Sequence, residues 1–542
     1  VYIHQFIYSM DKHKINIFYP VFFSVAIILG MFIGYKLHSN MPNTKSFFGV
    51  ATNNAESEVL QIIEDRYVDS VNTEKLSNAA ILSMLNELDP HSIFIPHQQL
   101  TEVNEDLEGS FQGIGIEFNI LHDTVHVMSV VEGGPSSQAG LEIGDQILNV
   151  DAHNAIGLKN SDEFKKWVKG PKGTQVKLQL YRGNKIISKN ISRDFIPMPS
   201  LEAFYMIDKT KGYIRLNRFS NNTYKEFIEA LQSLTSKGMK KLVLDLRDNG
   251  GGILEEAIDI IDELVGGDQM IVYTEGLKNP KKEYKSRRKG IFEDGEIVVL
   301  INEGSASASE VIAGALQDLD RATIVGRRSF GKGLVQEQFT LSDGSALRLT
   351  TARYYTPLGR SIQKPYDKGL QNYSAEVMER YHHPSSQSAD SNNIQKGNYV
   401  TSKAGKKLFG GGGITPDVFV PMEQLALDSN LNIFFRNNIL TSFAFKYFMQ
   451  HQSEIKQFKT IENYQSGFKL DQIAFTDLLR ETGQPAVIKK FSPDQILFIK
   501  GRIKAIIGRM VWKQNGFNYI LNAEDKTFLK ATEILNHPVS GK

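Results

Sequence analysis

The stretch KLVLDLRDNGGGILEEAIDIIDELV, residues 241–265, predicts a strand, a glycine-rich turn and a helix in direct succession. KLVLDL is an almost continuous apolar run, which is typical of a strand buried on both faces of a parallel sheet. ILEEAIDIIDELV has its apolar residues at helical spacing. The three glycines between them cost stability, and a chain tolerates them where positive φ or close backbone approach is needed. The N–H groups of such a turn could form half of an oxyanion hole, although a tight turn with a helix cap is an alternative explanation.

The same alternation of strands and helices extends from residue 212 to residue 362. GYIRLN, EIVVLIN and ATIVG are predicted strands, and NTYKEFIEALQSL and SEVIAGALQDL are predicted helices. This order favours an α/β layer around a partly parallel sheet. The predicted fold class is therefore α/β, in a chain of several domains.

The flanking segments have other patterns. Residues 109–195 contain short strand-like runs separated by turn residues, which predicts a small β-rich domain. Residues 56–88 and 421–542 have mostly helical spacing, and the polar segment 364–412 is predicted to be a mobile excursion. The predicted boundaries are 1–40 for a cytoplasmic tail and membrane anchor, 41–100 for a linker and N-terminal helical segment, 101–195 for the β-rich domain, 196–420 for the α/β core and 421–542 for a helical C-terminal extension.

Composition excludes several classes of function. The chain has 542 residues, 62 basic and 61 acidic, so its formal net charge is +1 and does not suggest a nucleic-acid partner. It contains no cysteine, which excludes disulfides, thiolate catalysis and cysteine-zinc sites. No histidine spacing typical of a zinc site is present in the sequence. We therefore predict neither a metal nor a cofactor.

The N-terminal region contains an uncharged apolar run. IFYPVFFSVAIILGMFIGY, residues 17–35, is long enough to cross a bilayer as a helix. Lys12 and Lys14 precede it, which favours a cytoplasmic N-terminus. The sequence thus predicts a single-pass signal anchor in the inner (cytoplasmic) membrane, with the rest of the chain in the periplasm or another extracytoplasmic space. A cleaved signal peptide and a buried helix are alternatives, and the start at Val1 or at Met10 is left open.

A serine-rich turn follows the predicted strand EIVVLI. NEGSASASE, residues 302–310, connects this strand to a helix. A serine at the positive end of a helix lies where developing negative charge is stabilised. Ser307 to Glu310 also match a capping box, S-x-x-E, which requires no catalysis.

The stretch GRRSFGKG, residues 326–333, has the G-x-x-x-x-G-K spacing of a phosphate-binding loop. Gly333 stands where that loop needs Ser or Thr, and the strand-like LVQEQFTL follows instead of a helix. Lys332 is then either a solvent-exposed hairpin residue or a base, because a neutral lysine amine can accept the proton of a serine hydroxyl. Lowering its pKa from about 10.4 to about 7 requires roughly 4–5 kcal/mol, which burial can supply.

These motifs occur together in one known family. NEGSASASE, SFGKG with Gln336 four residues after the lysine, DLRDNGGG, LDPHS at 88–92 and YTPLGRSIQ at 355–363 resemble the carboxyl-terminal processing peptidases, also named tail-specific proteases. The resemblance covers about residues 56–420. It implies a crotonase-like α/β protease core at 196–420 with an inserted PDZ domain at 101–195.

The resemblance also implies roles for individual residues. Ser307 would be the nucleophile, Lys332 the general base, and Gln336 the residue that orients the base. The oxyanion donors would be the N–H groups of Ala308 and Gly251, with Gly252 supporting them. Asp318 stands where some relatives carry an assisting acidic residue, and we expect it to be mainly structural. A serine and lysine dyad of this kind needs no histidine.

In the PDZ-like domain, GIGI at 113–116 resembles the loop that binds a C-terminal carboxylate while the peptide adds a strand to the sheet. The implied peptide-binding residues are Gly113, Ile114, Gly115, Ile116 and Leu141; an ordinary strand is the alternative. Lys169 stands where relatives often have arginine, and lysine makes a weaker, non-bidentate contact. Whether the domain activates, inhibits or only tethers is therefore left open.

The resulting prediction is a membrane-anchored serine endopeptidase that cuts exported proteins near their C-termini through an acyl-enzyme. Predicted partners are protein or peptide substrates with apolar C-termini, the membrane, and a homodimer partner or adaptor at the C-terminal extension, but no nucleic acid. Two alternatives are a catalytically silent PDZ scaffold that binds peptides and an acyl-thioester enzyme of the crotonase type.

Overall fold

The computed structural model describes residues 21–31, 55–121, 123–382, 399–400, 404–423, 428, 431–435, 438–483 and 491–537. The chain divides into two units, Val1–Ile81 and Leu82–Lys542. The first unit contains a helix over residues 21–31, helix α2 (Ala55–Arg66) and the first part of helix α3 (Thr73–Asn86). Helices α2 and α3 agree with the helical pattern that the sequence predicts over 56–88.

The predicted membrane anchor is wrong. Within the described ranges, we find no helix with the length and apolar character needed to span a bilayer. Of the apolar run, residues 21–31 are described, and they are helical. The flanking positions 17–20 and 32–35 lie outside the described residues. The localisation to the inner membrane, which depended on this anchor, is corrected with it.

The central sheet of the second unit has six strands in the order β10-β11-β12-β15-β16-β21. Strands β10 and β11 are antiparallel, and every other neighbouring pair is parallel. This sheet confirms the predicted α/β core. Its strands are β10 (Leu201–Met206), β11 (Lys211–Leu216), β12 (Lys241–Asp245), β15 (Glu296–Ile301), β16 (Ala322–Gly326) and β21 (Val418–Phe419).

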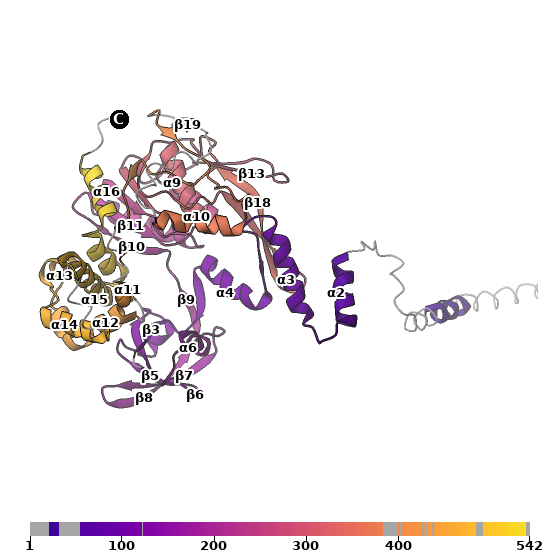
Figure 1. Cartoon of the computed structure of the whole chain (residues 1–542), viewed down its shortest axis with the longest axis horizontal. Coiled ribbons are helices and arrows are strands. Elements are labelled where there is room, and N and C mark those ends of the chain that lie inside the picture. Colours follow the sequence, from indigo (N-terminus) through magenta and orange to yellow (C-terminus); the bar gives the residue numbers. More distant parts are fainter. Residues whose placement is uncertain are drawn as a thin grey trace, which may run out of the picture. The chain divides into compact units, whose positions relative to one another are not determined.

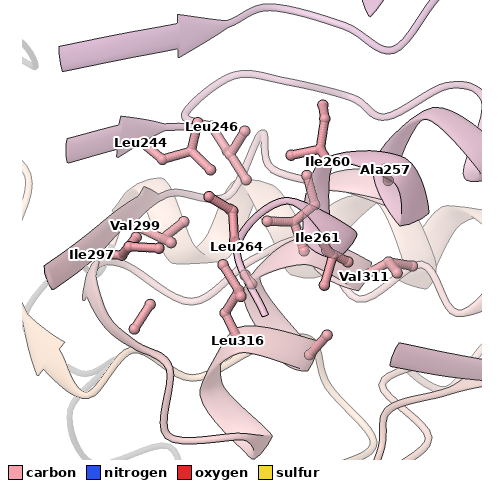
Figure 2. Packing of buried hydrophobic residues seen from close by; sticks show 14 of the residues in the cluster. Leu244, Leu246, Ala257, Ile260, Ile261, Leu264, Ile297, Val299, Val311 and Leu316 are labelled. Atoms are coloured by element: carbon pink, nitrogen blue, oxygen red, sulfur yellow. The ribbon is translucent and has the colours of Figure 1, made fainter. Parts of the chain in front are cut away.

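Helices cover both faces of this sheet (Figure 1). One face packs against α7 (Thr223–Ser236), α8 (Leu254–Asp262) and α9 (Ala308–Asp318), and Figure 2 shows Leu244 and Val299 of the strands with Ile261 of α8 and Leu316 of α9. The other face packs against α16 (Lys526–Asn536) through Phe528, Ala531 and Leu535. Side chains of a strand alternate between the two faces, so each continuous apolar run fills both layers.

A second sheet lies beside the core in the order β1-β18-β13-β14, and β17 also pairs with β18. Helix α10 falls within the segment that the sequence predicts to be a mobile excursion, so part of that segment is regular; residues 383–398 and 401–403 lie outside the description. The elements of this region are β1 (Ile93–Ile95), α4 (His97–Glu108), β13 (Met270–Glu275), β14 (Lys282–Lys285), β17 (Leu334–Thr340), β18 (Ala346–Tyr355), α10 (Leu370–His382), β19 (Tyr399–Val400) and β20 (Lys407–Leu408).

The β-rich domain has a sheet in the order β3-β4-β5-β7-β8, with β6 paired to β5 and a separate ribbon of β2 and β9. Strand β3 is an edge strand of this sheet, and Phe164 of α6 fills the core beneath it. Its elements are β2 (Ser110–Gly113), β3 (Ile116–Leu121), β4 (Thr124–Val130), α5 (Pro135–Gln138), β5 (Gln146–Val150), β6 (His153–Asn154), α6 (Ser161–Val168), β7 (Gln175–Arg182), β8 (Lys185–Ser192) and β9 (Asp194–Pro197).

The C-terminal region is helical, as its sequence spacing predicts. Phe448, Tyr464 and Phe475 belong to its own buried cluster. The long helix α15 is interrupted at Trp512 and Lys513, where Lys513 has φ of 55°. The helices before α16 are α11 (Asn432–Phe435), α12 (Ile439–Ile455), α13 (Ile461–Gly467), α14 (Gln472–Glu481) and α15 (Pro493–Asn522).

Candidate active site

A cavity of about 950 Å³ in the second unit brings the predicted catalytic residues together. It lies where the turn after β12, the N-terminus of α9 and the residues before β17 meet. All six residues that the sequence implicates line it: Gly251, Gly252, Ser307, Ala308, Lys332 and Gln336. A cavity of this volume is large enough for a short peptide segment.

Ser307 occupies a strained turn between strand β15 and helix α9. It is the N-cap residue of α9, with φ of 54° and ψ of −116°. A residue other than glycine rarely adopts positive φ, and such strain is found at functional sites, including the strand-to-helix turns that present catalytic serines. The turn places Ser307 at the positive end of the α9 dipole and on the wall of the cavity.

Glu310 connects the serine turn to the lysine loop. Its buried carboxylate accepts hydrogen bonds from Ser307 N (2.9 Å), Lys332 N (2.9 Å), Gly331 N (2.7 Å) and Ser329 Oγ. Burial raises the pKa of Glu310 to about 7, although the four donors lower it. The sequence gives Glu310 only a capping role, and its contacts with the lysine loop, which is distant in sequence, were missed.

Lys332 is half-buried, and Gln336 holds its amine. Its Nζ donates to Gln336 Oε1 at 2.9 Å, and Gln336 Nε2 donates to the carbonyl oxygen of His91. Burial lowers the pKa of Lys332 below its ordinary value of 10.5, and the positive charge of Arg348 lowers it further. In the part of the chain that the structure describes, no hydrogen bond joins Lys332 Nζ to Ser307 Oγ.

Tyr354 links the backbones of the two loops. Its buried hydroxyl lies 3.1 Å from Ser307 O and within hydrogen-bonding distance of Lys332 O. A tyrosine hydroxyl has one proton, so it donates to one of these carbonyl groups at a time. The residue stands in the predicted strand ALRLTTARYY, and nothing in that pattern distinguishes Tyr354 from its neighbours.

The glycine turn approaches the serine closely. Gly251 has φ of 96°, and a Cβ atom there would lie 2.7 Å from both Ala306 O and Ser307 Cβ. Gly251 N donates to the side chain of Asn249 at 2.9 Å. Gly252 also needs to be glycine, because its Cβ would lie 2.0 Å from Phe219 O. Ala308 begins helix α9, where an N–H group has no acceptor within the helix.

The LDPHS segment contacts Lys332 indirectly, through Gln336. Asp89 accepts hydrogen bonds from His91 N (2.8 Å) and Ser92 N (2.9 Å), which fixes the His91 carbonyl that Gln336 contacts. Burial lowers the pKa of His91 to about 4, and the charge of Lys332 contributes to this shift. Histidine 91 is therefore neutral near pH 7. The sequence used this segment only as part of the family resemblance.

Asp318 lies elsewhere. It pairs with the fully buried Arg360 and accepts a hydrogen bond from Leu358 N at 2.9 Å, and it is not a wall residue of the cavity among the residues described. These contacts agree with the structural role expected for it.

A second cavity, of about 970 Å³, lies beside the edge strand β3 and helix α6. Its apolar walls are Ile116, Phe118, Ile120 and Leu158. Of the five residues predicted for peptide binding, all within the described chain, Ile116 lines this cavity. The other four are not among its walls: Gly113 pairs with Asp194, Gly115 has φ of 74°, and Ile114 and Leu141 belong to the domain core, where they are 2% and 5% exposed.

Lys169 makes an ion pair with a helix outside the β-rich domain. Its Nζ lies 2.7 Å from Glu105 Oε2 on α4, and it also lies over the ring of Phe111. A lysine offers a single point charge here, where an arginine could bind a carboxylate through two N–H groups.

Three known families match parts of the chain. Peptidase family S41 matches residues 210–371, the PDZ domain matches residues 112–192, and a family of unknown function, DUF8443, matches residues 431–513. The glycine turn, Ser307 and Lys332 all lie inside the first of these matches.

Individual proteins match over longer stretches. A carboxy-terminal-processing protease of Bartonella bacilliformis is 37% identical over 313 residues, which cover 56% of this chain and 71% of the relative. A probable CtpA-like serine protease of Staphylococcus aureus is 35% identical over 353 residues, 64% of this chain and 68% of the relative. Among solved structures, the photosystem II D1 C-terminal processing protease is 29% identical and covers 57% of this chain and 89% of its own, with a TM-score of 0.33.

Proposed function

This chain belongs to peptidase family S41 and carries a PDZ domain, and on that premise we propose that it cleaves proteins near apolar C-termini with Ser307 as nucleophile and Lys332 as general base. The matches to this peptidase family and to serine proteases confirm the resemblance found in the sequence. The observation that carries the proposal is the single cavity lined by both residues, whose loops share the carboxylate of Glu310.

The first step is proton transfer from serine to lysine. Burial favours the neutral amine of Lys332, and Gln336 holds that amine through one hydrogen bond. Rotation of the Ser307 or Lys332 side chain brings Oγ and Nζ into contact. The amine then takes the hydroxyl proton while Oγ attacks the carbonyl carbon of the scissile peptide bond.

The tetrahedral oxyanion needs donors in a dry site. Ala308 N–H at the start of α9 is one candidate donor, since the helix leaves it without an internal acceptor. Gly251 N–H is the other, provided that it exchanges its bond to Asn249 for the oxyanion. Gly252 supports the turn by fitting against Phe219, where any side chain would collide.

Collapse of this intermediate completes the acyl-enzyme. The Lys332 ammonium returns its proton to the leaving amine, the C–N bond breaks, and the acyl group remains on Ser307 Oγ. Lys332, neutral again, takes a proton from water as the water oxygen attacks the ester. The Lys332 ammonium then returns that proton to Ser307 Oγ as the ester C–O bond breaks, which releases the new C-terminus. Each cycle consumes one water and regenerates both side chains.

Recognition of the substrate tail is assigned to the PDZ domain. A peptide that adds to the free edge of β3 would run along the cavity beside α6, with its carboxylate at the turn of Gly115 and Ile116. The apolar side chains of Ile116, Phe118, Ile120 and Leu158 favour an apolar tail. A homodimer or adaptor contact through residues 421–542 stays a prediction.

The experiment compares wild type with Ser307→Ala and Lys332→Ala on a protein substrate that ends in an apolar tail. We expect both variants to bind the tail and to release no product, while wild type forms an acyl-enzyme detectable by mass spectrometry. Turnover by Ser307→Ala at the wild-type rate would refute the assignment of the nucleophile. Tail binding by wild type without any hydrolysis would favour the alternative of a silent PDZ scaffold.

A further inference from the structure

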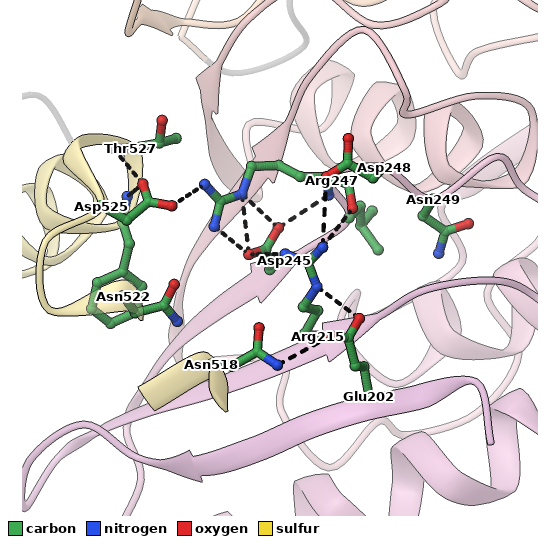
Figure 3. A network of polar contacts seen from close by, with 12 residues as sticks. Glu202, Arg215, Asp245, Arg247, Asp248, Asn249, Asn518, Asn522, Asp525 and Thr527 are labelled. Atoms are coloured by element: carbon green, nitrogen blue, oxygen red, sulfur yellow. Dashed lines mark hydrogen bonds and ion pairs between the residues drawn. The ribbon is translucent and has the colours of Figure 1, made fainter. Parts of the chain in front are cut away.

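A buried polar network lies under the glycine turn (Figure 3). Asp245, which ends strand β12, is fully buried between two guanidinium groups. Its carboxylate lies 2.6 Å from Arg247 Nη2 and 3.2 Å from Arg215 Nη1. One carboxylate cannot neutralise two guanidinium groups whose side chains are only 17% and 11% exposed, so at least one further anion is needed nearby.

The second anion of Arg247 comes from the C-terminal region. Asp525, at the corner between α15 and α16, lies 2.5 Å from Arg247 Nη1 through Oδ2. Its other oxygen, Oδ1, caps α16 by accepting from Thr527 N at 2.8 Å and Phe528 N at 3.0 Å. Both oxygens of this carboxylate are thus used, one for the helix and one for the protease core.

Arg215 is neutralised in the same corner. Its Nε lies 3.0 Å from Glu202 Oε2 on β10, and Glu202 Oε1 accepts a hydrogen bond from Asn518 Nδ2 of α15 at 3.1 Å. The C-terminal helices therefore contact both arms of the network, and Figure 3 shows Asn518 and Asp525 on that side of it.

The network continues into the catalytic turn through the backbone. Arg247 N donates to Asp245 Oδ1 at 3.0 Å, and the next residue, Asp248, donates its N–H to Asn302 Oδ1 at 2.9 Å. Asn249 O then accepts from Ala306 N at 3.0 Å, next to Ser307. These bonds thus connect Arg247 to the turn that carries Gly251 and to the loop that carries the serine.

We propose that Asp525 is a positioning residue for hydrolysis: by pairing with Arg247 it fixes the glycine turn in the place from which Gly251 N–H exchanges its bond to Asn249 for the oxyanion. This inference rests on the proposed function of Ser307 and Gly251. It makes the segment after residue 522, which lies outside the three family matches, a working part of the protease core. The packing of α16 on the second face of the central sheet gives this segment a fixed place from which to act.

The experiment uses the full chain with Asp525→Asn. Asparagine keeps an oxygen to cap α16 but removes the charge opposite Arg247. We expect kcat, normalised to titrated active sites, to fall about tenfold, because loss of an oxyanion donor costs about 10²–10³ and a displaced donor costs part of that. KM for the tailed peptide should stay within about twofold of the wild-type value, which is on the order of assay error. The midpoint of the pH profile should stay within about 0.3 pH units of the wild-type midpoint.

The matched control is Asp471→Asn. Asp471 caps α14 in the same region through Ala474 N at 2.7 Å and makes no ion pair with the core among the described residues. We expect it to have wild-type kcat. Asp525→Ser, a neutral residue that also caps helices, is the second variant if Asp525→Asn folds poorly.

Each outcome decides the proposal. A kcat for Asp525→Asn equal to that of the Asp471→Asn control, with Ser307 still essential, would overturn the positioning role and leave the proposed function intact. A fall in activity carried by KM alone would also overturn it. If neither Asp525 variant folds, the pair serves folding and the positioning role is rejected. Activity that persists in Ser307→Ala would instead reject the proposed function itself.

Discussion

Removing the hydroxyl group of Tyr354 tests how the two catalytic loops are held together. Tyr354→Phe keeps the buried ring and deletes only the donor that faces Ser307 O and Lys332 O. Ser307 O remains satisfied, because it also accepts from Glu310 N at 2.8 Å and Val311 N at 3.0 Å. The carbonyl oxygen of Lys332 loses its hydrogen bond from the Tyr354 hydroxyl and has no other donor in the described part of the chain.

The expected cost follows from that one carbonyl group. A buried polar group left without a partner costs about 1–3 kcal/mol. If the loop that carries Lys332 opens locally, its opening equilibrium should rise roughly 5-fold to 150-fold. The base is then misplaced for part of the time, and we expect kcat to fall by up to about 10²-fold with little change in KM.

Hydrogen exchange measures the opening directly. We expect faster exchange in peptides that cover residues 328–336 and no change in peptides from the C-terminal helices. Tyr355→Phe is the matched control, because this neighbour stacks on Tyr273 and contacts neither carbonyl group. Exchange and kcat that match the control would refute the claim that Tyr354 ties the loops together.

Two further predictions concern charge. Arg348→Ala should raise the pKa of Lys332 and move the rise of kcat/KM to higher pH, while Arg353→Ala on the same strand should not; identical profiles would contradict the electrostatic effect of Arg348. Burial raises the pKa of Glu310 from 4.5 to about 7, so the folded protein favours the protonated carboxyl group. The stability that this proton contributes is fully present below pH 4.5 and is lost as the pH rises through about 7. The free energy of unfolding of wild type relative to Glu310→Gln should therefore fall by about 3 kcal/mol between pH 4.5 and pH 8. Thermal unfolding midpoints of the two proteins across this pH range measure the change. Midpoints that vary with pH in the same way for both proteins would count against it.

The sequence predicts those parts of the site that depend on local chemistry. The strand of residues 241–246, the glycine turn and the serine turn each have a pattern within a few residues, because a buried strand, positive φ and a helix start all restrict residue type. The strand β12 and the helix α8 appear in the order predicted, and the motif residues meet in one cavity.

The residues that the sequence missed act through contacts between distant segments. The His91 carbonyl accepts from Gln336 across 245 positions, and Tyr354 contacts Ser307 across 47. No spacing rule connects such pairs, since they meet only after the second sheet forms beside the first. Asp525 was missed for the same reason, because it reads locally as a helix cap.

The structure overturned the predicted membrane anchor and, with it, the predicted localisation to the inner membrane. Hydropathy records the apolar character of residues 17–35, whereas no helix in the described part of the chain has the length and apolar character that a span requires.

The central claim is that a half-buried, uncharged amine at Lys332 takes the proton of Ser307. Competitive acetylation of lysine amines against pH, read by mass spectrometry on the peptide that contains Lys332, measures the titration of that amine in the folded chain. We predict a midpoint below 10.5 that coincides with the midpoint of the rise in kcat/KM. A midpoint near 10.5, or activity that rises at a pH where Lys332 remains fully protonated, would contradict the account.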